Sequence, residues 1–152
     1  ASDEPFSVSA WIYRTGEDTT FSGIVAKDQG SPNREWCLGY DVDNDEIRFF
    51  IKSQGTDIQQ SIDSTTKIEL NQWYHVVATY NANESYTGIQ IYINGQTETP
   101  KDPYNQSYVA MSDTTSPLTI GRYFNSDNRA WIGAIDEVAI WDRALDPVHY
   151  QK

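Results

Sequence analysis

The fold of this chain is decided by one stretch near its C-terminus, which reads Trp131-Ile132-Gly133-Ala134-Ile135-Asp136-Glu137-Val138-Ala139-Ile140-Trp141-Asp142-Arg143-Ala144-Leu145. Apolar residues dominate the stretch and β-branched isoleucine and valine are enriched, so it predicts a long strand rather than a helix. Both alternating faces of that strand are largely apolar, which predicts a strand covered on both sides in the middle of a sandwich or barrel. Asp136 and Glu137 interrupt the run. A buried carboxylate is costly unless it is hydrogen-bonded, paired or bound to a metal, so Asp136 is the first chemical clue in the sequence.

Outside this stretch, the sequence shows the alternating patterns of further short strands. Residues 131–141 are the last of about nine predicted strands, and the others lie at residues 6–13, 24–27, 36–42, 46–52, 59–64, 73–80, 89–93 and 118–121. Residues 43–45 and the pair Asn94-Gly95 predict hairpin turns, and residues 99–116 predict a long loop. Asp146 and Pro147 predict the start of a final helix. The sequence therefore predicts an all-β sandwich.

Four segments in a fixed order give the chain a resemblance to a known family. The stretch 131–145 resembles the closing strand of laminin-G-like, concanavalin A-like jelly-roll domains. Residues 6–12, 71–80 and 91–95 resemble the entry strand, the central strand and the following hairpin of the same family. The resemblance covers nearly the whole chain and implies a two-sheet antiparallel jelly-roll sandwich. It implies less about function, because this fold is shared by lectins, enzymes and adhesion modules.

Length and charge restrict the organisation of the chain and its partners. Its 152 residues suit one domain of ordinary size. We expect residues 1–152 to be a single laminin-G-like domain excised from a larger protein and lacking the family's first strand. The formal charge of −11 argues against nucleic acid or an anionic membrane as a partner, and it fits a secreted or cell-surface protein. No apolar run approaches the roughly 20 residues that a membrane helix needs, so no membrane insertion is expected.

The motifs of catalysis are absent from the sequence. The resemblance implies that glycosidases with this fold would carry a Glu-x-Asp-x-x-Glu motif on one strand, and no such motif occurs. Asp136 and Glu137 are adjacent and would point to opposite faces of a regular strand. Cys37 is the only cysteine and is expected to be a buried, inert thiol. His75 and His149 are too far apart in the sequence to suggest a zinc site. We therefore expect no enzyme activity.

A structural Ca²⁺ is the one cofactor that the resemblance implies. In the family, the aspartate equivalent to Asp136 often helps to bind this ion, together with loop carbonyls and the strand that we expect to be missing. The alternative is that Asp136 only accepts hydrogen bonds from neighbouring backbone amides. Residues 41–46 look superficially like an EF-hand loop, but Glu46 stands where that loop needs glycine and Lys52 where it needs glutamate.

The composition of three loops suggests sugar binding. Sugars stack on flat aromatic rings, while planar polar groups hydrogen-bond their hydroxyls. We expect one binding loop at residues 122–131, joined across a cleft by residues 33–36, and a weaker candidate at residues 103–108. The candidate ligand-binding residues are Arg34, Trp36, Tyr123, Asn125, Asp127, Asn128, Arg129 and Trp131. The alternative is that these aromatic residues pack the edge of a sheet and that the asparagine and aspartate residues only form turns.

The expected function is therefore that of a non-catalytic carbohydrate-binding or adhesion module of a larger extracellular or cell-surface protein. Its partner would be a glycan or polysaccharide, and a protein partner is a second option. The alternative is a protein–protein interaction or structural spacer domain of a surface or virion protein. The two hypotheses differ in whether Arg34, Trp36, Tyr123 and Trp131 expose faces that converge on one groove.

Overall fold

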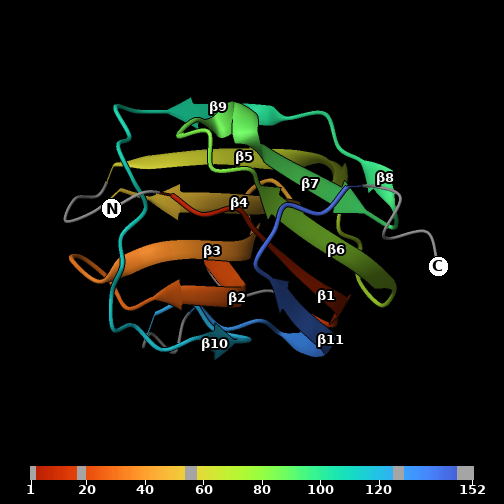
Figure 1. The fold of residues 1–152 in the computed structure, drawn as a ribbon. Coiled ribbons are helices and arrows are strands. Elements are labelled where there is room, and N and C mark those ends of the chain that lie inside the picture. Colours follow the sequence, from red (N-terminus) through yellow and green to blue (C-terminus); the bar gives the residue numbers. More distant parts are fainter. Residues whose placement is uncertain (1–2, 17–19, 54–57, 125–128, 147–152) are drawn as a thin grey trace.

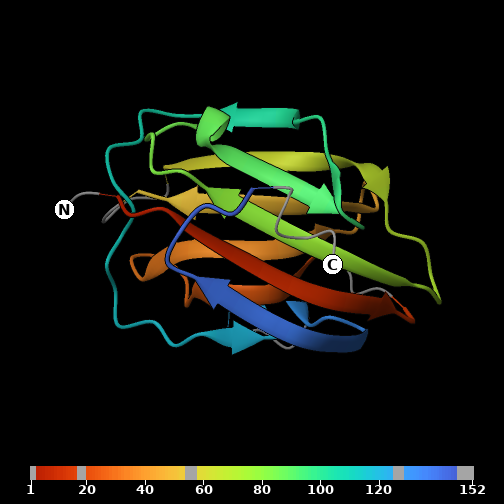
Figure 2. The same ribbon diagram turned by 45° about the vertical axis from the view of Figure 1, so that its right-hand side comes forward.

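The protein is an antiparallel β-sandwich. A computed structural model describes residues 3–16, 20–53, 58–124 and 129–146. These residues form eleven strands and one short 3-10 helix, Tyr86–Gly88. Figures 1 and 2 show the strands stacked as two sheets, one over the other. The prediction of an all-β, two-sheet antiparallel sandwich is confirmed.

The two sheets contain five and six strands. Sheet A has the order β11 (Gly133–Trp141), β1 (Phe6–Arg14), β6 (Trp73–Tyr80), β7 (Ile89–Ile93) and β8 (Gln96–Thr97). Sheet B has the order β10 (Thr119–Ile120), β2 (Phe21–Asp28), β3 (Arg34–Asp41), β4 (Glu46–Lys52), β5 (Gln59–Lys67) and β9 (Lys101–Asn105). All the strand pairs in both sheets are antiparallel.

The core lies between the sheets and follows from the alternation of side chains along each strand. Val8, Ala10 and Ile12 of β1 point inward and are fully buried. Leu38 of β3 and Ile91 of β7 are among the residues that meet them in one continuous apolar cluster. Because successive side chains of a strand point to opposite faces, the residues between these positions lie on the outer faces of the sandwich.

The hairpins form where the sequence predicts them, whereas part of the long loop predicted at residues 99–116 forms a strand. Asp45 has a φ of 59° in the β3–β4 turn, and Asn94 and Gly95 have φ values of 51° and 76° in the β7–β8 turn. Two consecutive positive φ values are those of a type I′ hairpin turn. Residues 101–105 of the predicted loop instead form β9, which pairs with β5 at the edge of sheet B. The chain then passes across one end of the sandwich to β10 at the opposite edge (Figures 1 and 2).

The closing strand differs from its prediction. β11 pairs only with β1, so it is an edge strand with an exposed outer face rather than a strand covered on both sides. A β-bulge interrupts its pairing, and Glu137 in the bulge has a φ of 48°. The extra residue places Ile135 opposite Ile12 and Ile140 opposite Val8. Both isoleucines therefore face the inner side of the sheet, although their spacing in a regular strand would separate them. The predicted final helix begins at Pro147 and lies outside the described residues.

Candidate functional site

The outer face of sheet B carries a groove that collects charged and aromatic side chains. We call it the sheet-B groove. It has a volume of about 280 Å³ and is lined by Phe21, Arg34, Arg48, Phe50, Lys52, Gln59, Tyr123, Phe124 and Arg129. Four of the 11 lysine and arginine residues of the chain are therefore in one small site of a molecule with a net charge of −11. Arginine side chains such as Arg34 and Arg129 can donate hydrogen bonds to an anionic group of a ligand.

The floor of the groove comes from consecutive strands. Arg48, Phe50 and Lys52 alternate along β4 with inward-facing core residues, so all three project from the outer face. Arg34 begins the neighbouring strand β3, and Gln59 begins β5 on the other side. The period-two alternation of strands thus places side chains from three adjacent strands on one surface.

One wall of the groove is the segment that follows β10, and a missing side chain lets it approach. A Cβ atom on Gly23 of β2 would lie 2.4 Å from the carbonyl carbon of Arg122 and 2.5 Å from the amide nitrogen of Tyr123. Backbone hydrogen bonds fix the segment: the Gly121 amide donates to the Ile24 carbonyl over 2.8 Å, and the Tyr123 amide donates to the Arg129 carbonyl over 3.0 Å. Glycine at position 23 is therefore what allows this wall to lie directly on the sheet.

The aromatic rings of the groove pack against one another. The ring of Tyr123 stacks on that of Phe124, with centroids 3.9 Å apart, and meets the rings of Phe21 and Phe50 edge-on at 5.2 Å and 5.7 Å. Together with Ala26 and Cys37 they form a small second apolar cluster on the outer face of sheet B. Tyr123 is only 5% exposed, so its ring supports the site from beneath and is not an open stacking surface.

The guanidinium groups are held in place by these rings and by buried carboxylates. The guanidinium carbon of Arg34 lies 4.7 Å from the centroid of Phe124, and that of Arg129 lies 5.3 Å from the same centroid. Asp28 is fully buried and lies 3.7 Å from the Arg34 Nε. Burial raises the pKa of the Asp28 carboxyl, while the amide of Gly30 and the charge of Arg34 act in the opposite direction. Cation–π contacts and ion pairing therefore orient two guanidiniums at the same end of the groove.

Arg48 is held more tightly than the other two arginines. It donates from Nε and Nη2 to the two carboxylate oxygens of Asp63, both at 2.6 Å, and its Nη2 lies 2.7 Å from Asp41. Desolvation raises the pKa of Asp63, and the hydrogen bond from Arg48 lowers it. Arg48 thus compensates a nearly buried carboxylate, and its charge is largely balanced within the protein.

The structure brings together three of the residues predicted from the sequence and separates two others from them. Arg34, Tyr123 and Arg129 line the sheet-B groove, as expected if residues 33–36 meet the 122–131 loop. Trp36 and Trp131 are 5% and 7% exposed and pack in the core between the sheets, so they present no aromatic face to this groove. The parity of Trp36 with the core residues Leu38 and Tyr40 could have shown this. Asn125, Asp127 and Asn128 lie outside the described residues.

A second cavity, on the outer face of sheet A, was not foreseen. We call it the sheet-A cavity; it has a volume of about 430 Å³ and is lined by Trp11, Trp73, Asp136 and Glu137. Trp11 and Trp73 are 37% and 46% exposed. The signal in the sequence is that Trp11 and Trp73 share the parity of the polar positions in their strands, Ser7 and Ser9 in β1 and His75 in β6.

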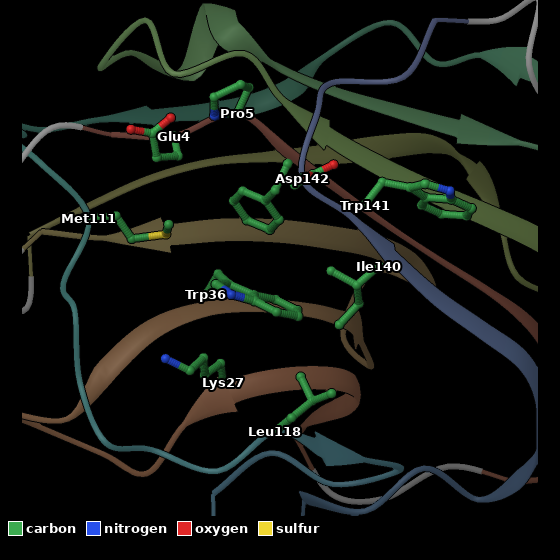
Figure 3. A pocket seen from close by; sticks show the side chains of 10 residues that line it. Glu4, Pro5, Lys27, Trp36, Met111, Leu118, Ile140, Trp141 and Asp142 are labelled. Atoms are coloured by element: carbon green, nitrogen blue, oxygen red, sulfur yellow. The ribbon is translucent and has the colours of Figure 1, made fainter.

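A third cavity, larger than the sheet-B groove and the sheet-A cavity, opens between the edges of the two sheets. Its volume is about 880 Å³, and Trp36, Met111, Leu118 and Ile140 are among the side chains that line it (Figure 3). Lys27 stands at its border, where its Nζ donates to Glu35 Oε1 over 2.5 Å. Most of the lining is apolar, and Glu4, Lys27 and Asp142 add charged groups to it. The sheet-B groove differs from this cavity in that several arginines line it.

The carboxylates of Asp136 and Glu137 are exposed, contrary to the expectation of a buried pair. Asp136 Oδ1 accepts a hydrogen bond of 2.8 Å from the Glu137 amide, which matches the alternative without a metal. Among the described residues, the one group of three carboxylates close enough to share an ion is Glu46, Asp63 and Asp102, and lysine and arginine side chains pair with all three. Calcium at Asp136 stays a prediction, and the exposed carboxylate alone offers few of the six to eight oxygens that this ion needs.

Cys37 is buried, as predicted, and burial raises the pKa of its thiol well above the ordinary value. Such a thiol is protonated at neutral pH and is a poor nucleophile. No helix among the described residues is long and apolar enough to cross a membrane.

Comparison with known proteins gives one family for nearly the whole chain. Residues 1–149 match the family model described as the concanavalin A-like lectin/glucanases superfamily. Part of the chain is also 33% identical, over 75 residues, to adhesion G-protein coupled receptor D1 of Bos taurus. That match covers 49% of this chain and only 7% of the receptor, so the chain spans a small part of the length of this curated relative.

Solved structures with a similar fold include parts of carbohydrate-active proteins. The carbohydrate-binding module CBM40 of a Ruminococcus gnavus IT-sialidase has a TM-score of 0.71 at 12% identity, over 98% of this chain and 82% of that one. Domain 4 of AbnA, an extracellular arabinanase of Geobacillus stearothermophilus solved in complex with arabinotriose, has a TM-score of 0.61 at 22% identity, over 99% and 66%. At these identities the likeness shows a shared fold.

Proposed function

Because the chain belongs to the concanavalin A-like lectin/glucanases superfamily, we propose that it is a non-catalytic carbohydrate-binding module of a larger extracellular or cell-surface protein. The sheet-B groove is its binding site, and its ligand is a glycan that carries a carboxylate. The observation that carries the proposal is the arrangement of Arg34 and Arg129 over the Phe124 ring in the sheet-B groove.

The proposed chemistry follows from the shapes of the groups. A guanidinium presents parallel N–H donors that match the two oxygens of a carboxylate, and hydrogen bonds between charged groups are roughly twice as strong as neutral ones. Gln59 adds a side-chain amide that can both donate to and accept from sugar hydroxyls. The ring of Phe124 is only half-buried and offers apolar area beside these polar groups. The groove thus combines charge recognition with contact to the C–H face of a sugar.

The similar structures support a carbohydrate as the ligand, and the preference for a carboxylate rests on the groove alone. Domain 4 of AbnA was solved with arabinotriose, a neutral sugar, and the sialidase module is called a carbohydrate-binding module. Some other similar chains are sialidases, which are enzymes, so the fold by itself does not separate binding from catalysis. Our proposal of a non-catalytic role rests on the groove, whose described lining residues include arginine and lysine but no aspartate, glutamate or histidine.

A glycan-array screen of the purified domain tests the proposal. We expect selective binding to glycans with uronic or sialic acids, loss of binding in the double variant Arg34→Gln/Arg129→Gln, and unchanged binding in Arg143→Gln, which removes an exposed arginine outside the groove. A folded domain that binds no acidic glycan, or that hydrolyses one, would contradict the proposal. A parallel screen in EDTA tests calcium, because a calcium-braced fold or site would lose binding or thermal stability there.

A second candidate function is protein binding, and one observation favours it. Exposed apolar side chains lie along β10, β11 and the segments that lead into them, namely Leu118, Ile120, Ile132 and Ile140. Contiguous exposed apolar surface is typical of interaction sites. If the array is blank and the domain self-associates through this edge in solution, the spacer or protein-binding function gains support.

A further inference from the structure

We propose that the sheet-A cavity binds an alkylammonium group, as carried by choline-like small molecules or by a lysine side chain. The inference does not rest on the glycan proposal, because the cavity lies on the outer face of the other sheet. It is carried by two exposed tryptophans beside two carboxylates, and each part of this arrangement follows from the strands.

The aromatic walls come from two neighbouring strands. Trp11 of β1 lies opposite His75 of β6, and Tyr13 lies opposite Trp73, so two pairs of rings stand side by side on the outer face of sheet A. The Trp11 and His75 rings have centroids 5.1 Å apart, and the Tyr13 and Trp73 rings have centroids 5.4 Å apart. The indoles of Trp11 and Trp73 line the cavity and are 37% and 46% exposed, so a ligand in the cavity can contact them. Among aromatic rings, the indole attracts an ammonium group most strongly.

The acidic wall comes from the bulge in β11. Asp136 lies opposite Trp11 in the β1–β11 pair, and the bulge allows the next residue, Glu137, to line the same cavity instead of the opposite face. In the part of the chain that the structure describes, neither carboxylate forms an ion pair with a lysine or arginine. Two negative charges thus lie beside two exposed indoles, and no lysine or arginine among the described residues forms an ion pair with them.

The other groups around the cavity leave this negative potential in place. Burial lowers the pKa of His75, while Glu137 acts to raise it, and the net shift is downward. His75 is therefore neutral at pH 7. The net charge of −11 also attracts cations to the surface over a longer range.

The same chemistry discriminates against other ligands. An acidic sugar would meet two like charges, so the ligand proposed for the sheet-B groove is repelled here. A neutral sugar or an apolar group would gain contact with the indoles but no attraction to the carboxylates. An alkylammonium group uses both walls, because its methyl or methylene groups contact the rings while its charge faces Asp136 and Glu137.

The test is a titration of the isotope-labelled domain followed by its tryptophan indole N–H resonances. Choline chloride is the probe, 3,3-dimethylbutan-1-ol is the neutral group of nearly the same shape, and sodium chloride matches the ionic strength. We expect choline to shift the Trp11 and Trp73 signals, which Trp11→Phe and Trp73→Phe assign, and to bind about tenfold more tightly than the alcohol. Equal affinity for the alcohol, or no shift of these two signals by choline, would overturn the proposal.

Variants of the exposed carboxylates keep the test decisive even if a tryptophan variant fails to fold. Asp136→Asn/Glu137→Gln should weaken choline binding about tenfold, while Asp113→Asn, an exposed carboxylate outside the cavity, should leave it unchanged. An unchanged affinity in the double variant would contradict the role of the carboxylates.

A second probe, Nα-acetyl-lysine amide, distinguishes the two sources of the alkylammonium group. Tighter binding of this probe than of choline points to lysine side chains. We expect Arg34→Gln/Arg129→Gln to retain choline binding, so this variant distinguishes a failure of the alkylammonium proposal from a failure of the glycan proposal.

Discussion

At the scale of single residues, the most consequential interaction is that of Arg48 with Asp63. The carboxylate of Asp63 is almost completely buried, and Arg48 donates two hydrogen bonds to it. Removing the cation would leave a buried charge without compensation. We expect Arg48→Gln to lower the free energy of unfolding by about 3 kcal/mol, measured by urea denaturation.

The control for that measurement is Arg143→Gln, which we expect to change the free energy of unfolding by less than about 0.5 kcal/mol because the side chain is exposed. A loss of similar size in both variants would show that the Arg48 pair contributes nothing specific to stability.

Glu98 makes stability depend on pH. Its carboxylate accepts hydrogen bonds of 2.8 Å from the amides and hydroxyls of Thr65 and Thr66. Desolvation acts to raise the pKa of Glu98, but these hydrogen bonds outweigh it and hold the pKa below the ordinary value of 4.5. Because the folded pKa is depressed, the stabilisation is present above pH 4.5 and is lost as the pH falls through the lower folded pKa.

The variant Glu98→Gln therefore has a predictable effect. At pH 7 we expect it to cost about 1–3 kcal/mol, because an amide cannot accept all four hydrogen bonds. Denaturation curves from pH 7 to acid should show the difference from wild type shrinking below pH 4.5. A difference that stays constant over this range would contradict the assignment.

At the scale of elements, the segment after β10 depends on the absence of a side chain in β2. A Cβ atom at Gly23 would overlap the backbone of Arg122 and Tyr123. We expect Gly23→Ala to lift this segment from sheet B, to weaken glycan binding, and to lower the free energy of unfolding by about 1–3 kcal/mol. Amide spectra should show changes concentrated at residues 121–124 and 129–131, and unchanged spectra there would exclude this role for Gly23.

The alternation of side chains predicts most elements, and the exceptions have local causes. β9 has the sequence Lys-Asp-Pro-Tyr-Asn, and proline inside a polar stretch is typical of a loop, but it is tolerated in an edge strand such as this one. The bulge at Glu137 is a backbone irregularity that leaves no mark in the periodicity, so the outward position of both carboxylates could not be read from the sequence. Whether β11 lies at the edge of its sheet depends on which strands pair with it, and strand pairing is determined by contacts between residues that are far apart in the sequence.

The part of the candidate site that could be predicted from the sequence is the meeting of residues 33–36 with the loop at residues 122–131. Arg34, Tyr123 and Arg129 do line one groove. Composition alone did not separate aromatic residues that face a ligand from those that fill the core. Trp131 packs edge-on against Tyr40 at 5.8 Å, and its Nε1 donates to the Ala134 carbonyl, so a tryptophan in a polar loop is a core residue here.

At the scale of the whole molecule, the two sites that we propose lie on the two outer faces of the sandwich. Sheet B presents cations held on aromatic rings, and sheet A presents carboxylates beside indoles. The core between them is continuous and apolar. This arrangement suits a module that connects a glycan on one side with a cationic partner on the other.

The central claim, that the sheet-B groove recognises a carboxylate-bearing glycan, is tested most directly by calorimetric titration. The best acidic oligosaccharide from the array would be compared with its carboxyl-reduced form, in the wild type, in Arg34→Gln/Arg129→Gln and in Arg143→Gln. We predict that the acidic form binds at least about tenfold more tightly than the reduced form, and that only the double variant abolishes this preference. Equal affinity for the two forms, or a preference that survives in the double variant, would contradict the account.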